Sequence, residues 1–120
     1  MYGLPEDFDA SFFVGLELGY VTYSVNTVCL IFGKDVSISI ESSFQHQATP
    51  NEADAEIQHV PITTCSDLMQ LLGRSVEAVN ANADGTLTLT FSGGHVFRCF
   101  DDASGYESYS IEHGGERIIV

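Results

Sequence analysis

Alternation of apolar and polar residues is the feature that most limits how this chain can fold. Residues 36–40 read VSISI and residues 87–91 read LTLTF, so an apolar side chain stands at every second position. Successive side chains of a β-strand point to opposite faces, so each segment is expected to bury one face and hydrate the other. We therefore predict a mainly β protein whose core includes seven residues of two hairpins: Leu30, Phe32, Ile38, Ile40, Leu87, Leu89 and Phe91.

The two hairpins belong to longer segments that share a pattern. One hairpin joins 28–32 to 36–41 through the turn GKD, and the other joins 87–91 to 96–101 through the turn SGG. An apolar residue and a glycine open each segment (Val14-Gly15 and Leu72-Gly73), and apolar residues follow three and six positions later. This pattern predicts two repeat-like halves, 14–44 and 72–111, related by a pseudo-twofold rotation. The alignment needs two one-residue gaps, so chance similarity between two hairpins remains the alternative.

The remaining segments complete the fold prediction. One short α-helix is expected to begin at a cap, Thr64 or Ser66, and to end at Gly73. The polar stretch 45–59 is predicted to be a loop with at most one short edge strand before Pro61. The length of 120 residues suits a single domain, 1–120. We expect eight to ten short strands in a partly closed barrel or a sandwich, architectures that limit exposed strand edges.

Charge is the most unusual property of the composition. The chain has 17 Asp and Glu residues against four Lys and Arg residues, which gives a formal net charge of −13. Such a surface repels nucleic acids and anionic membranes, and it attracts basic proteins and speeds their approach. The alternative is that the charge serves solubility alone.

The cysteines and the N-terminus predict a reducing location. The three cysteines (Cys29, Cys65 and Cys99) are an odd number and form no CxxC pair, which argues against an internal disulfide framework. The start MYGLPEDFD has neither the basic nor the apolar region of a secretory signal, and no apolar stretch approaches the ~20 residues that span a bilayer. We expect a cytoplasmic protein with reduced thiols.

No motif for catalysis or cofactor binding is present in the sequence. The four histidines (His46, His59, His95 and His113) lack metal-ligand spacing, and we expect His95 and His113 to be exposed residues of turns. Cys65 precedes the expected helix, where a thiolate would be stabilised, but no neighbouring residue in the sequence would activate it. We therefore predict no metal, no cofactor and no enzymatic activity.

Carboxylates gather in groups that could meet a basic partner. Glu52, Asp54 and Glu56 share one side of an extended segment. Asp101, Asp102 and Glu107 form a second group, with Tyr106 and Tyr109 beside it, and tyrosine is enriched in protein interfaces. We predict that these eight residues bind the partner. The alternative is a hydrated acidic face with the tyrosines in the core.

The second half of the chain resembles a known family. Residues 71–79 (LLGRSVEAV), 85–94 (GTLTLTFSGG), 106–111 (YESYSI) and 118–120 (IIV) are similar to a family of small bacterial proteins of unknown function. At Tyr109 that family more often has Trp, and the first half matches only through the hairpin 28–41. The resemblance implies a duplicated β domain and provides no catalytic residues. Small acidic proteins of this kind also resemble immunity proteins of bacterial toxin systems.

Charge and resemblance together lead to one functional hypothesis with two rivals. We expect an immunity protein, or antitoxin, whose acidic surface blocks a basic, nuclease-like toxin domain. The first rival is a non-catalytic bacterial protein that acts by self-assembly, for example as a homodimer, or by binding another partner. The second rival is a small enzyme that uses Cys65 or a carboxylate.

Overall fold

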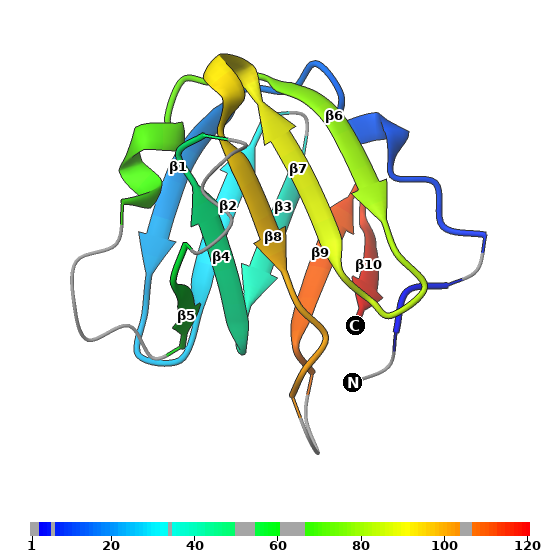
Figure 1. Cartoon of the computed structure of the whole chain (residues 1–120). Helices are drawn as coiled ribbons and strands as arrows, with labels where there is room; N and C mark the ends of the chain where they lie inside the picture. The colour runs from blue at the N-terminus through cyan, green and yellow to red at the C-terminus, as the bar shows by residue number, and fades with distance from the viewer. Residues whose placement is uncertain (1–2, 6, 34, 50–54, 61–66, 104–106) are drawn as a thin grey trace.

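Ten strands form two antiparallel sheets of five strands each. The computed structural model describes residues 3–5, 7–33, 35–49, 55–60, 67–103 and 107–120. The first sheet has the order β1-β2-β3-β9-β10 and the second the order β5-β4-β8-β7-β6. In Figure 1 the second sheet lies in front of the first. The first sheet consists of β1 (Leu18–Tyr23), β2 (Val28–Phe32), β3 (Val36–Ile40), β9 (Tyr109–His113) and β10 (Glu116–Ile119). The second consists of β5 (Ile57–His59), β4 (Ser43–Gln47), β8 (Val96–Cys99), β7 (Leu87–Phe91) and β6 (Val76–Ala81).

Each half of the chain contributes strands to both sheets. The first three strands are neighbours in the first sheet. The chain then crosses to the second sheet, where β4 pairs with β8 and β5 pairs with β4. The second half does the reverse, because β6, β7 and β8 stay together while β9 pairs with β3. The prediction of a mainly β protein with eight to ten strands is confirmed for the described residues.

The core lies between the two sheets, and the predicted core residues are confirmed. All seven residues predicted to be buried have a relative exposure of 4% or less. Phe32 and Phe91, which end β2 and β7, stack across the sheets with ring centroids 6.3 Å apart. Phe13, from the short 3-10 helix η1 (Ser11–Phe13), adds an edge-to-face contact with Phe32 at 5.6 Å. Aromatic residues from both halves therefore fill one continuous core.

The same ladder occurs in both sheets. β1 and β6 each have a bulge after their first residue, and the first residues pair with Phe32 and Phe91 respectively. Backbone hydrogen bonds between the halves come in matching pairs around a bridge between Glu17 and Ser75. The four bonds run from Gly15 N–H to the Val76 carbonyl (2.8 Å), Gly73 to Leu18 (2.9 Å), Val76 to Leu16 (2.8 Å) and Leu18 to Arg74 (3.0 Å). Gly15 and Gly73 make these turns with φ of 90° and 80°, which other residues rarely adopt.

Two expectations about local structure are wrong. The segment predicted as an α-helix is a 3-10 helix of four residues, η2 (Leu68–Leu71), and the described residues contain no α-helix. The helix stops because Leu72 is extended and Gly73 must reach the Leu18 carbonyl. Its predicted caps, Thr64 and Ser66, lie outside the described residues.

The predicted loop 45–59 is also wrong at its start, because Ser43–Gln47 is β4, an inner strand of the second sheet. The sequence of this strand lacks a clear alternation of apolar and polar residues, because Phe44 is its one apolar residue. The expected edge strand before Pro61 is confirmed as β5. No helix of the described residues is both long and apolar enough to span a membrane.

Candidate functional site

The first predicted carboxylate group can be placed only in part. Glu52 and Asp54 lie outside the described residues, and so does Tyr106 of the second group. Glu56 is exposed just before β5.

The second carboxylate group fixes loops of the protein itself. Asp102 accepts hydrogen bonds from the hydroxyls of Ser42 and Ser43, each at 2.5 Å. Asp101 accepts one from the Ser108 hydroxyl at 2.9 Å and one from the Gly3 N–H at 2.8 Å. Carboxylates that accept such hydrogen bonds help to fix the backbone around them.

Glu107 forms an ion pair with Arg117 at 3.4 Å and is partly exposed. Asp102 is the most exposed carboxylate of this group. The group therefore retains some exposed charge, but its polar contacts within the chain give it a structural role.

Tyr109 was predicted to bind the partner, and this prediction is wrong. Its side chain is fully buried, and its hydroxyl donates a hydrogen bond to the Gly85 carbonyl at 2.6 Å. Burial raises the pKa of the Tyr109 phenol well above its ordinary value. Tyr109 is a core residue of β9 and is not accessible to a partner.

The expectation for the histidines holds for His113 and fails for His95. His113 is exposed at the end of β9 and stacks on Phe12 with ring centroids 3.9 Å apart. His95 is buried, with a relative exposure of 7%, because its carbonyl accepts the Phe91 N–H and places it on the inner face of the ladder. His46 on β4 is buried as well, at 7%.

Two of the three thiols are described, and both are free. Cys99 is fully buried on the inner face of β8, and burial raises the pKa of its thiol far above the ordinary value. Cys29 is partly exposed on β2 and lies 3.6 Å from the Ser39 hydroxyl. Cys65, the thiol named in the enzyme alternative, lies outside the described residues.

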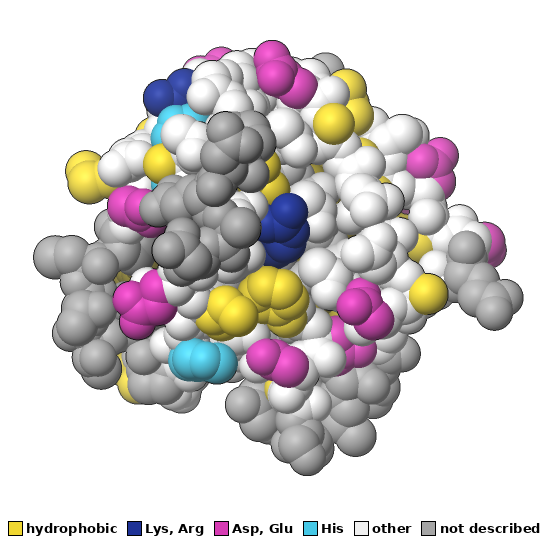
Figure 2. Space-filling view, in the orientation of Figure 1, with side chains coloured by type: hydrophobic (Ala, Val, Ile, Leu, Met, Phe, Trp, Pro, Cys, Tyr) yellow, Lys and Arg dark blue, Asp and Glu magenta, His cyan; other side chains and the backbone are white. Residues whose placement is uncertain are grey.

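Exposed residues that sequence reasoning missed belong to β1 and η2, two elements that contact each other, and to the residues beside them. Tyr20 is 67% exposed, Met69 is 70% exposed and Leu72 is 42% exposed. Glu17 and Asp67 are exposed acidic residues of the same two segments. Figure 2 shows hydrophobic and acidic side chains next to each other in the area where η2 lies in Figure 1. We call these five residues the β1–η2 surface: Glu17, Tyr20, Asp67, Met69 and Leu72.

Acidic side chains are spread widely over the molecule. Most of the described Asp and Glu residues are exposed, and Figure 2 shows them scattered over the face of the second sheet. Among the described basic residues, Arg117 has a carboxylate partner, whereas Arg98 donates to the side chains of Gln45 and Gln47. The negative field is therefore a property of the whole surface.

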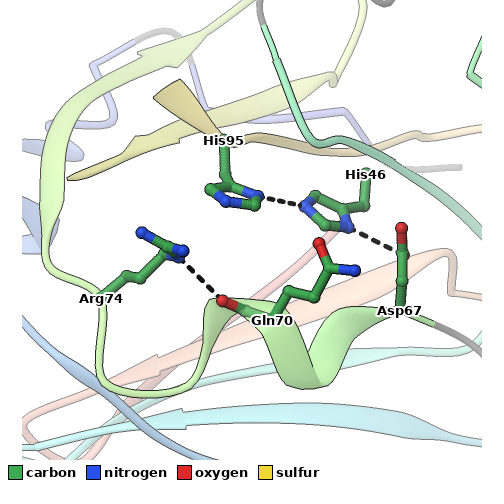
Figure 3. A network of polar contacts seen from close by, with 5 residues as sticks. All are labelled: His46, Asp67, Gln70, Arg74 and His95. Carbon is green, nitrogen blue, oxygen red and sulfur yellow. Dashed lines mark hydrogen bonds and ion pairs between the residues drawn. The ribbon is translucent and has the colours of Figure 1, made fainter. Parts of the chain in front are cut away.

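A chain of three polar side chains crosses from the surface into the core next to η2 (Figure 3). Asp67 is 53% exposed, and its Oδ1 lies 2.8 Å from Nδ1 of His46, whose side chain is 2% exposed. Nε2 of His46 lies 2.9 Å from Nδ1 of His95. We call this arrangement the Asp67–His46–His95 chain.

The hydrogen bonds of this chain determine where its protons lie. A carboxylate accepts, so Nδ1–H of His46 donates to Asp67, and in the tautomer with a single ring proton Nε2 of His46 is an acceptor. Nδ1–H of His95 then donates to that nitrogen, and Nε2 of His95 carries a lone pair. Burial lowers the pKa of His95, and the nearby Arg74 and His46 lower it further, against an opposing effect of Asp67. The lowered pKa of His95 favours the neutral form of its imidazole.

The two histidines occupy ladder positions that are apolar in the other sheet. His46 stands opposite Phe97 in the second sheet, as Ile111 stands opposite Ile38 in the first. The His95 carbonyl accepts the N–H of Phe91 in the second sheet, and Val36 pairs with Phe32 at the same position of the first sheet. The sequence signal for His46 was its position two residues after Phe44, on the same face of the strand.

Comparisons with known proteins place the chain in a family without assigning it an activity. A model of a family of unknown function matches residues 13–120. No curated protein and no solved structure matches the chain.

Proposed function

The chain belongs to DUF6188, a family of unknown function, and from its surface we propose that it binds and blocks a basic protein, in the manner of an immunity protein against a bacterial toxin. The observation that carries the proposal is the net charge of −13, carried by carboxylates that are mostly exposed. A nuclease-like toxin must be basic to bind phosphate, so an acidic protein can occupy the same site. The proposal assigns binding alone, without catalysis, in a reducing cytoplasm.

The β1–η2 surface is the contact that best suits this function. Exposed Tyr and Met side chains are typical of the centre of protein interfaces, and charged residues are typical of the rim. Tyr20 and Met69 would supply the apolar contact, and Glu17 would meet basic side chains of the partner. The predicted group of Asp101, Asp102 and Glu107 is less suited, because its carboxylates have partners within the chain.

The proposal is tested by recovering the partner and measuring association kinetics. We expect a pull-down from the native cell, or co-expression with the neighbouring gene product, to yield a basic protein. Its association should be fast at low salt and slow steeply as salt rises, because screening acts beyond about 8–10 Å. Recovery of the chain alone, or of an acidic partner whose binding ignores salt, would favour self-assembly instead.

Two variants with matched controls locate the contact. Tyr20→Ala should raise Kd at least about tenfold, mainly through faster dissociation. Glu17→Gln should slow association at low salt. The controls are Val25→Ala, an apolar residue 80% exposed in the β1–β2 turn, and Glu116→Gln, an exposed acid of β10. Equal effects of variants and controls would place the contact elsewhere.

We further propose that the two halves are copies of one unit, related by a pseudo-twofold axis near the Glu17–Ser75 bridge, and that their sheets form a sandwich. The matching bulges and paired hydrogen bonds support this proposal. The test is a superposition of experimental coordinates of β1–β3 on β6–β8. Hairpins that do not superpose together with their preceding 3-10 helices would contradict it.

A further inference from the structure

Arg74 is a cation that forms no ion pair with any residue that the structure describes, although the protein is acidic. Its Nε donates to the Gln70 carbonyl at 2.8 Å and its Nη1 to the Ser92 carbonyl at 3.1 Å. Within the described part of the chain no carboxylate forms an ion pair with it, although carboxylates greatly outnumber basic residues. A guanidinium held by carbonyls in this way keeps further N–H donors for a ligand.

The loop that follows β7 leaves room for this guanidinium. Gly93 has a φ of 85°, and a Cβ atom there would lie 2.4 Å from Nη1 of Arg74. The same Cβ would lie 3.6 Å from Cδ2 of His95, so Gly93 is flanked by both side chains. Figure 3 shows the guanidinium on the side of the His95 ring that faces away from His46.

The outer nitrogen of His95 is free to contact a ligand. Nδ1 of His95 is used by His46, and Nε2 has no hydrogen-bond partner among the described residues. No buried side-chain nitrogen or oxygen atom of the described residues lacks a partner, so this nitrogen must be reached by solvent. An imidazole nitrogen with some exposure to solvent therefore lies beside the partly exposed side chain of Arg74.

From this juxtaposition we propose that Arg74 and His95 form a binding site for an oxyanion, a phosphate or carboxylate group, and that His95 takes up a proton when the anion binds. The anion would accept hydrogen bonds from the Arg74 guanidinium and from Nε2–H of His95. The resulting imidazolium would donate through Nδ1–H to His46, and His46 would donate to Asp67. The negative charge of Asp67 thus offsets the positive charge of the histidine pair. The anion ligands of this site, Arg74 and His95, lie outside the β1–η2 surface, and Asp67 belongs to both.

The counterparts of His46, His95 and Arg74 in the other half of the chain indicate that these three residues are more than structural. The ladder positions of His46 and His95 are filled by Ile111 and Val36 in the other sheet. Leu16 is the counterpart of Arg74 in the first half of the chain. The N–H of Leu16 donates to the Phe13 carbonyl, just as the N–H of Arg74 donates to the Leu71 carbonyl. Apolar residues therefore suffice for the fold at these positions. Polar residues at all three positions of one half indicate a ligand.

The charged groups around His95 determine the pH dependence of binding. Arg74 approaches from the connection between η2 and β6, His46 from β4 and Asp67 from the start of η2. Without an anion, Arg74 opposes protonation of His95. A bound anion reverses the sign of the local charge and favours protonation. Anion affinity should therefore rise at least about tenfold between pH 8 and pH 6.

The test is a titration of the full chain with inorganic phosphate, and separately with acetate, followed by NMR of the histidine ring nitrogens. We expect a saturable shift of Nε2 of His95 that is stronger at pH 6. Arg74→Gln and His95→Gln should each weaken binding at least about tenfold, since each removes a charge-assisted hydrogen bond. Arg98→Gln is the matched control, because Arg98 is another guanidinium that donates to uncharged partners, Gln45 and Gln47, and it should leave binding unchanged.

The outcomes separate the sources of the anion. Phosphate binding without acetate binding assigns a tetrahedral free anion, and acetate binding assigns a carboxylate such as that of a metabolite or a chain terminus. If Arg74→Gln does not fold, Arg74→Lys keeps the charge, loses the planar fork and should weaken binding. The proposal is overturned if neither anion shifts His95 saturably, or if the Arg98 and Arg74 variants weaken binding equally.

Discussion

The buried histidine pair allows a prediction about stability that depends on two residues jointly. His46→Ile and His95→Val give the second sheet the residues that the first sheet has at the same ladder positions. Each single change leaves one buried imidazole nitrogen without its partner, because Nε2 of His46 and Nδ1 of His95 bond to each other at 2.9 Å. An unsatisfied buried polar group costs about 1–3 kcal/mol.

The double change removes both polar groups and should restore stability. Asp67 loses its contact with His46, but it is 53% exposed, so water replaces the imidazole at a cost below about 1 kcal/mol. Two buried aliphatic side chains offset that cost, since each contributes about 1.5–3 kcal/mol when fully buried. The double variant should therefore be at least as stable as the wild type, with a coupling free energy of at least about 2 kcal/mol.

Guanidinium denaturation of the wild type, both single variants and the double variant at pH 7.5 measures this coupling. The pKa of His95 is lowered from its ordinary value, so the imidazole of His95 is neutral at that pH. Additive single effects with no coupling would mean that the two rings do not share a hydrogen bond. A double variant about 2 kcal/mol less stable than the wild type would mean that these positions cannot take apolar residues.

Three further predictions follow from the core and its titratable groups. Phe91→Ala should lower the free energy of unfolding by about 3–5 kcal/mol, because Phe91 is fully buried. A loss below about 1 kcal/mol in a denaturant titration would mean that the other face of β7 is the buried one. Tyr109→Phe should cost about 1–3 kcal/mol, since the Gly85 carbonyl loses its buried donor, and an unchanged denaturation midpoint would contradict that contact. The pKa of His95 in the folded protein lies below its unfolded value of about 6.5, so the unfolded chain binds more protons and stability should fall as pH drops below about 6.5 towards the folded pKa. Denaturation of wild type and His95→Gln at pH 7.5 and 5.5 checks this, and equal pH dependence of the two proteins would refute it.

The hairpins could be predicted from sequence because their signal is local. Ile38 and Leu89 lie in segments where every second residue is apolar, and that period determines both the strand and its buried face. The exchange of strands between sheets could not be predicted, because the pairing of β4 with β8 joins residues about fifty positions apart through a polar segment. The 3-10 form of η2 depends on the contact of Gly73 with Leu18, which is also non-local.

The candidate site was harder to predict than the fold. His46 and His95 are separated by 49 positions, and no spacing rule brings them together. The carboxylates near Tyr109 formed an apparent cluster in the sequence, but the chain uses Asp101 and Asp102 to hold its own loops. Tyr20 and Met69 gave no sequence signal, because an exposed apolar residue is recognised only when the rest of the core has been assigned.

Amide hydrogen exchange of the free chain and of its complex tests the proposed function most directly. We expect slower exchange on binding at residues 21–23 of β1 and at residues 69–72, around the β1–η2 surface. We expect no change at β10 (Glu116–Ile119), an edge strand of the same sheet that serves as an internal control. Protection confined to β10 or β5, with β1 and η2 unchanged, would contradict the assignment of this surface to a basic partner.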